Sequence, residues 1–320
     1  MLAETRFQVA PILDTWQNAF EAWLRLDGRK KSMLPLREKS IQACLQDIRH
    51  YSQFHLQSSS RDFTPDQLNP QIVHSYFESQ ITAAPASINR RLASLRTLVR
   101  WSLQFGLLDQ DPTARIPRIE SSKLPPRAKD RSDCRSLAKT VKAGKHLKCN
   151  TQHQRVLGLR DQVIWALMYD AGLRIGSVAA LDIEGLHLAE GWIAVSVKGG
   201  KIGEIAIPKR LARLLSEWVK VRPGQSTGAV VTDWNGQRIT TGQIRRRLYA
   251  IAKVADVNVK PHDLRHTYIY RLMDQALEGD RPLPAALDLV RQQACHSDVR
   301  TTQSYLRARL SEIRSVVEGM

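Results

Sequence analysis

One segment constrains the fold of this chain most, because it separates two kinds of sequence pattern. Residues 109–133 contain four prolines and show little apolar periodicity, which is typical of a linker. The chain has 320 residues, a length that commonly forms two domains. We therefore expect a first domain in residues 1–110, a linker in 111–132 and a second domain in 133–320.

The sequence before the linker predicts helices only. Apolar residues recur at helical spacing, and predicted helices cover residues 14–26, 36–54, a segment beginning at Thr64, and 87–105. Pro65 and Gln67 follow Thr64 in the pattern of a capped helix start. Four helices of this size suit a small bundle.

The sequence after the linker mixes helices with short strands. Alternating runs at 192–197 and 202–207 flank Gly199-Gly200, which predicts a hairpin with a two-residue turn. Helices are predicted at about 155–171, from Arg174, and at about 208–221, 241–255, 262–277, 284–294 and 301–308. The expected fold class is mainly α with a small antiparallel β-sheet, an α+β arrangement.

The charge of the chain indicates a polyanionic partner. Lys and Arg number 48 against 31 Asp and Glu, a net charge of +17, and nucleic acid is the commonest partner of such proteins. Residues 111–150 hold 11 basic and 4 acidic side chains, which favours a linker lying along DNA phosphates over a solvated tether. The candidate DNA-binding residues are Arg90, Arg91, Arg96, Arg100 and Lys201.

The cysteines and apolar runs exclude several other classes of protein. The four cysteines, Cys44, Cys134, Cys149 and Cys295, are not spaced as a metal site or a redox pair. No run approaches the roughly 20 apolar residues of a membrane span, and the N-terminus lacks the pattern of a signal peptide. We expect no metal, no cofactor and no membrane contact, and a cytoplasmic protein associated with the nucleoid.

Five short segments of the second half carry side chains suited to phosphate chemistry. Arg174 follows Gly172 at a helix start, where backbone N–H groups also favour an anion. Lys198 and Lys201 flank the predicted turn, and a lysine there can protonate a leaving oxygen. Each segment alone has an ordinary structural explanation, such as an exposed surface cation.

The remaining three segments add an imidazole pair, a guanidinium and a phenol. His262 and Arg265 lie three residues apart on one helix face, and His296 and Tyr305 follow. No carboxylate cluster for magnesium and no GxxxxGK[ST] loop accompanies them. Basic groups with a tyrosine and no metal indicate phosphoryl transfer stabilised by protein cations.

The order and spacing of these residues resemble the catalytic domain of tyrosine recombinases, the family of phage integrases and Xer-type recombinases. The family pattern is Arg, Lys, His-x-x-Arg, His or Trp, and Tyr; here the matching residues are Arg174, Lys198, His262, Arg265, His296 and Tyr305. The match covers roughly residues 130–310, and the first domain resembles the family's helical core-binding domain.

The resemblance implies a role for each matching residue. Tyr305 would attack the scissile phosphate to form a 3′-phosphotyrosyl link, with His262 as the base. Arg174 and Arg265 would hold the non-bridging oxygens, supported by His296. Lys198 would be the general acid, with Lys201 as the alternative.

The resemblance also implies partners and rival functions. The partner would be double-stranded DNA with paired recombination sites. The protein would be a monomer in solution and a homotetramer on this DNA, and it would recombine the DNA of a mobile element. The rivals are strand relaxation like that of a type IB topoisomerase, and a non-catalytic DNA-binding accessory protein of the same fold.

The chain departs from the family pattern in three places. Ser177 stands where the family often has an acidic residue, and Ala294-Cys295 stands where it usually has Leu-Gly. The gap between Arg265 and His296 is longer than in compact members, with the extra residues expected in 278–284. All of the reacting groups remain, which indicates a divergent subfamily.

Overall fold

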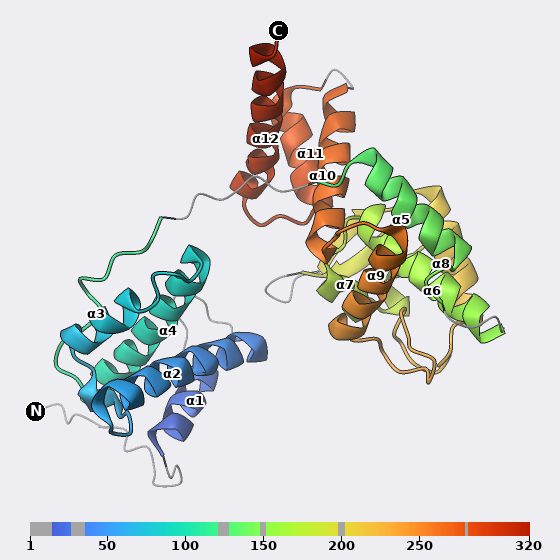
Figure 1. Cartoon of the computed structure of the whole chain (residues 1–320). Helices are drawn as coiled ribbons and strands as arrows, with labels where there is room; N and C mark the ends of the chain where they lie inside the picture. Colours follow the sequence, from blue (N-terminus) through green and yellow to red (C-terminus); the bar gives the residue numbers. More distant parts are fainter. Residues whose placement is uncertain (1–14, 27–35, 121–127, 148–151, 198–201, 279–280) are drawn as a thin grey trace, which may run out of the picture. The chain divides into compact units, whose positions relative to one another are not determined.

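The computed structural model describes residues 15–26, 36–120, 128–147, 152–197, 202–278 and 281–320, without the side chains of 152, 307–312 and 315. The chain divides into two compact units, within residues 1–123 and 124–320 (Figure 1). Among the described helices, none combines the length and apolar character needed to cross a membrane.

The first unit is a helical bundle, as the sequence predicts. Its elements are α1 (Trp16–Leu26), α2 (Glu38–Ser59), the 3-10 turn η1 (Pro65–Gln67), α3 (Pro70–Glu78) and α4 (Pro85–Gln104). The capping pattern at Thr64 starts only the short turn η1, and α3 has its own cap, because the Asn69 side chain accepts a hydrogen bond from Ile72 N. Fully buried rings such as Phe20, Tyr51 and Tyr76 fill the core.

The segment after α4 returns along that helix. Arg96 donates hydrogen bonds to Thr113 O and Ile116 O, at 3.3 and 2.7 Å. The Asn89 amide donates to Ile119 O at 2.7 Å and accepts from Ile119 N at 3.0 Å. The predicted linker therefore begins with residues that are bonded to the first unit.

The second unit contains a small sheet and eight helices in its described part. Its helices are α5 (Arg131–Ala143), α6 (Gln152–Tyr169), α7 (Ile175–Ala180), α8 (Lys209–Val221), α9 (Thr241–Ala255), α10 (Pro261–Glu278), α11 (Leu283–Gln293) and α12 (Val299–Glu318), with a 3-10 turn η2 (Ile183–Gly185). Strands β1 (Leu186–His187), β2 (Trp192–Ser196) and β3 (Ile202–Ala206) form an antiparallel sheet in the order β1-β2-β3. The predicted fold class is confirmed.

Two predictions about these elements need correction, and a third, the turn at Gly199-Gly200, lies outside the described residues. The strands that flank it are confirmed, with Ser196 of β2 paired to Ile202 of β3. Helix α5 was missed because its start overlaps the proline-rich segment, although Asp130 caps it through Asp133 N. Helix α12 continues to Glu318, whereas the helix predicted around Tyr305 ends at about residue 308.

Helix α10 links the two apolar clusters of the second unit. Leu264 belongs to the larger cluster, which α6 and the sheet also line. Ile269 belongs to a smaller cluster that includes residues of α11 and α12. Arg265 and His266 therefore lie where α10 passes from one cluster to the other.

Candidate active site

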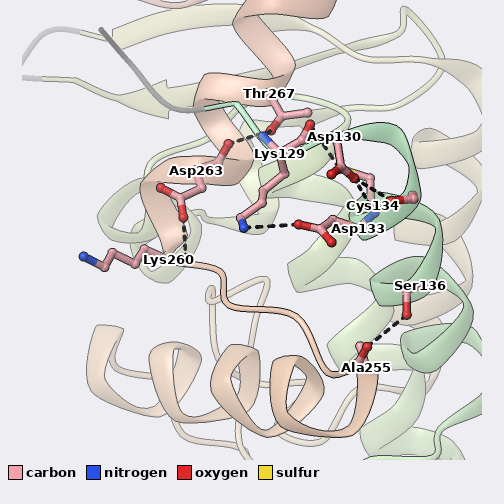
Figure 2. A network of polar contacts seen from close by, with 10 residues as sticks. Lys129, Asp130, Asp133, Cys134, Ser136, Ala255, Lys260, Asp263 and Thr267 are labelled. Atoms are coloured by element: carbon pink, nitrogen blue, oxygen red, sulfur yellow. Dashed lines mark hydrogen bonds and ion pairs between the residues drawn. The ribbon is translucent and has the colours of Figure 1, made fainter. Parts of the chain in front are cut away.

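Helix α10 is fixed at its N-terminal turn by polar contacts (Figure 2). Asp263 accepts a hydrogen bond from Lys260 N at 2.8 Å, which satisfies a donor at the helix start. Thr267 accepts one from Lys129 N at 2.8 Å and donates one to Asp263 O at 2.8 Å. Lys129, two positions before α5, is thus bonded to the helix that carries His262 and Arg265.

The turn between α6 and α7 requires glycine at position 172. Gly172 has φ +64°, and a Cβ there would lie 2.2 Å from the ring of Tyr268. The turn places Arg174 at the N-cap of α7, with its side chain exposed. The sequence therefore positions an exposed guanidinium at a helix N-terminus.

The Arg265 side chain connects three of the segments that form the site. It is 5% exposed and donates to Gly172 O and to Ala294 O, each at 2.5 Å. Burial and the charge of Arg174 lower the pKa of Arg265 to about 10, so it remains a cation at neutral pH. Its bonds link α10 to the turn before α7 and to the end of α11.

His296 follows a residue with strained backbone. Cys295 has φ +47°, in the left-handed region that glycine adopts most readily. His296 is 6% exposed, and its Nδ1 lies 3.0 Å from the hydroxyl of Thr302. Burial and the charges of Arg265 and Arg174 lower its pKa to about 4, so the imidazole is neutral.

Tyr305 is buried beside these groups. It lies on α12, is 3% exposed, and its hydroxyl is 2.6 Å from Nδ1 of His266. Its ring centroid lies 5.0 Å from that of Tyr270 and 6.4 Å from that of His296. Burial raises the pKa of Tyr305 to about 12, against the lowering effect of Arg265 and Arg174. The hydroxyl is therefore protonated at neutral pH.

His262 occupies a different position from the one its predicted role suggests. It is exposed at the first turn of α10, and its ring centroid lies 6.0 Å from that of His266. Burial of part of the ring and the charges of Arg265 and Arg174 lower its pKa. The imidazole in contact with the Tyr305 hydroxyl is that of His266.

Sequence reasoning missed two residues of this site. His266 directly follows Arg265 and lies four residues after His262, so helical spacing was the available signal. Thr302 lies in the helix that carries Tyr305, where a threonine near the start suggests only a helix cap. The cap is Asp298, which accepts from Arg300 N at 2.9 Å, and this leaves the Thr302 hydroxyl to contact His296.

The hairpin lies beside the turn that carries His296. A Cβ on Gly203 of β3 would lie 2.6 Å from Sγ of Cys295. Ser177 on α7, where the family often has an acid, donates to Ser196 O at the end of β2, at 3.5 Å. Lys198 and Lys201 lie outside the described residues.

The predicted DNA-binding arginines of α4 all have partners within the first unit. Arg90 pairs with the buried carboxylate of Asp47 at 2.8 Å, although its side chain is 48% exposed. Arg91 bonds to the Gln80 side chain, Arg96 to main-chain oxygens, and Arg100 lies over the ring of Trp23. Arg90 leaves the most surface for another contact.

The chain is similar to known proteins over most of its length. The family model described as "Phage integrase family" matches residues 147–312. Tyrosine recombinase XerD of Lacticaseibacillus casei is 31% identical over 231 residues, 70% of this chain and 73% of that protein. Tyrosine recombinase XerC of Alcanivorax borkumensis is 28% identical over 239 residues, 73% of this chain and 72% of that protein.

Solved structures share the fold. A XerH site-specific recombinase bound to a palindromic difH substrate matches with a TM-score of 0.66 and 14% identity, over 97% of this chain and 98% of that one. A lambda integrase dimer bound to a COC′ core site matches with a TM-score of 0.65 and 12% identity, over 91% of this chain and 75% of that one.

Proposed function

This chain belongs to the phage integrase family and is a tyrosine-type site-specific recombinase, and from this premise we propose that Tyr305 is its nucleophile. The observation that carries the proposal is the placement of one buried phenol beside Arg265 and His296. In the proposed step, the Tyr305 oxygen bonds to the scissile phosphorus and the bond to the 5′-oxygen breaks. A 3′-phosphotyrosyl link conserves the phosphodiester energy until a 5′-hydroxyl of the partner duplex reverses the step.

Two arginines are proposed to hold the non-bridging phosphate oxygens. Arg265 uses two of its five N–H donors on main-chain oxygens, and Arg174 is exposed at a helix N-terminus. Both act electrostatically on Tyr305 and His296, which supports a shared site. Such fixed donors stabilise the charge that builds on the phosphate as the phenol attacks.

His296 is proposed to donate one further hydrogen bond to the phosphate. Its imidazole is neutral, and the Thr302 hydroxyl can donate to its Nδ1. The proton of a neutral ring then resides on Nε2, which becomes the donor. Thr302 is thereby proposed as a positioning residue, since its hydroxyl holds the ring at Nδ1 and leaves Nε2 for the phosphate.

A lysine of the hairpin is proposed as general acid for the leaving 5′-oxygen. Lys198 is the first choice and Lys201 the alternative, and the contact of Gly203 with Cys295 supports a hairpin close to the site. A 5′-phosphorothiolate leaving group needs no proton. Such a substrate should rescue alanine substitution of the true acid and leave the other variant unaffected.

The DNA and the assembly are proposed by analogy with the matched structures. The lambda integrase structures include a tetramer bound to a Holliday junction, and a Tn1549 transposon integrase is complexed with transposon right-end DNA. We propose that this chain, a monomer in solution, forms a tetramer on paired double-stranded sites for a mobile element, and that it acts in the cytoplasm at the nucleoid.

The arginines of α4 divide into two proposed groups. Arg90 and Arg91 are assigned to DNA phosphates, with Arg90 favoured by its exposure. Arg96 and Arg100 have contacts that support a structural role in the first unit. Loss of Arg90 should weaken binding similarly for all sequences and reduce its salt dependence.

The experiment is strand cleavage on a suicide duplex. The site is mapped by footprinting on DNA that flanks the gene, and a nick is placed a few nucleotides 3′ of the cleavage position so that the 5′-hydroxyl fragment diffuses away. A protein–DNA adduct should accumulate with the wild type and not with Tyr305→Phe. Relaxation of supercoiled DNA without recombinant product would support a topoisomerase instead.

A further inference from the structure

We propose that His266, which the family pattern does not include, is the general base that accepts the phenolic proton of Tyr305. The inference rests on the proposed role of Tyr305 as nucleophile. It assigns to His266 the step that the sequence pattern gives to His262. The contact that carries it is the 2.6 Å approach of His266 Nδ1 to the Tyr305 hydroxyl.

The direction of this hydrogen bond follows from the two protonation states. Burial raises the pKa of Tyr305, so its hydroxyl is present as a donor. Burial, the charge of His262 and the charge of Arg265 lower the pKa of His266, so its ring is neutral and has one nitrogen free of hydrogen. The phenol therefore donates to Nδ1, and the proton of the imidazole resides on Nε2.

The groups around His266 come from its own helix and from two neighbouring segments. On α10 these are His262 and Arg265, which oppose a positive charge on His266, and Asp263, which favours it. His296 lies at the turn before α12, where His266 affects its pKa, and Tyr305 lies on α12. These groups give a base that is neutral at pH 7 and gains a proton only transiently.

The proton balance of the step is complete. As the Tyr305 oxygen bonds to phosphorus, its proton moves to Nδ1 of His266 and an imidazolium forms. The bond from phosphorus to the 5′-oxygen breaks, and that oxygen takes a proton from the hairpin lysine. In religation the incoming 5′-hydroxyl returns its proton to the lysine, and His266 returns its proton to the departing phenolate.

His262 provides a matched control on the same helix. It lies one turn before His266, and the residue is exposed. Asparagine in place of histidine keeps an oxygen acceptor near the position of Nδ1 and cannot carry the proton. We therefore compare His266→Asn with His262→Asn, in adduct formation on the suicide duplex across pH 5 to 10.

The expected result is a change in both the rate and the pH profile. His266→Asn should form the adduct about 100-fold more slowly at pH 7 or worse, the usual contribution of a general base. Its rate should climb with pH as phenolate becomes available, and 3,5-difluorotyrosine at position 305, a more acidic phenol, should rescue it. His262→Asn should keep the fall in rate at low pH that the wild type shows when His266 becomes protonated.

Other outcomes separate this inference from the proposed function. If His266→Asn keeps the wild-type rate and profile while Tyr305→Phe forms no adduct, the base assignment is wrong and Tyr305 remains the nucleophile. A slow His266→Asn variant with an unchanged profile and no rescue by the acidic phenol would also overturn it, because His266 would then only support the fold.

A measurement without DNA tests the contact directly. With 3-fluorotyrosine at position 305, the fluorine resonance should report a titration below pH 6.5 from His266. That titration should disappear in His266→Asn and persist in His262→Asn. Its absence from the wild type would overturn the inference whatever the protein does to DNA.

Discussion

At the scale of single residues, the site depends on partners that fix a side chain in one state. His296 is buried and neutral, and its Nδ1 meets the Thr302 hydroxyl. Arg265 meets two main-chain oxygens from different segments. These contacts convert flexible side chains into fixed donors, which is the arrangement that electrostatic stabilisation of a transition state requires.

Replacement of Thr302 by valine tests whether its hydroxyl holds the His296 ring. Valine keeps the shape and leaves Nδ1 of His296 buried without its partner, which should cost about 1–3 kcal/mol of stability. Adduct formation should slow because the His296 ring is no longer held by a hydrogen bond at Nδ1. Thr301→Val, at the exposed neighbouring position, is the control and should change neither urea unfolding nor cleavage. Equal behaviour of the two variants would refute the role of Thr302.

At the scale of elements, two turns place site residues that the helices α10 and α12 do not carry. The turn at Gly172 sets Arg174, and the turn at Cys295 sets His296. Arg265 bonds to a carbonyl oxygen at each of these turns. A change in either backbone turn should therefore move a cation and an imidazole together.

Gly172→Ala is the direct test of the first turn. The new Cβ would overlap the Tyr268 ring, and the turn would hold alanine at a positive φ. We therefore expect about 2–4 kcal/mol of destabilisation in urea unfolding, together with loss of cleavage. Gly176→Ala is the matched control, since a Cβ there meets nothing within 4 Å and alanine favours the helix. Gly172→Ala with unchanged stability would contradict the account.

The sequence predicted these elements unevenly, for physical reasons. Periodic apolar residues located most of the helices and the two strands of the hairpin to within a few residues. Helix α5 was missed because its start overlaps the proline-rich segment, and α12 extends beyond its predicted end. The contact of His266 with Tyr305 joins residues 39 positions apart, which a linear pattern does not contain.

At the scale of the whole molecule, the imidazoles of the site connect it to the stability of the fold. The pKa of His296 is about 4, and burial with nearby positive charges also lowers the pKa values of His262 and His266. An unfolded histidine has a pKa near 6.5, so the unfolded chain binds more protons between these values. The contribution of these histidines to the free energy of unfolding is therefore fully present above about pH 6.5 and is lost as the pH falls.

This linkage predicts a pH-dependent free energy of unfolding. Between about pH 6.5 and 4 it should fall by up to about 1.4 kcal/mol per pH unit for each histidine that stays neutral in the fold. His296→Gln should reduce the slope, since glutamine does not titrate. Urea unfolding at fixed ionic strength measures it, and an equal slope in the wild type and His296→Gln would show that His296 binds a proton equally in both states.

The proposed nucleophile is tested most directly by locating the covalent bond. Trypsin cleavage after Arg300 and Arg307 releases residues 301–307, in which Tyr305 is the one phenol. Mass spectrometry of the trapped adduct should find the nucleotide on this peptide, attached at Tyr305 through its 3′-phosphate. A nucleotide on any other residue, or a covalent adduct that survives Tyr305→Phe, would contradict the account.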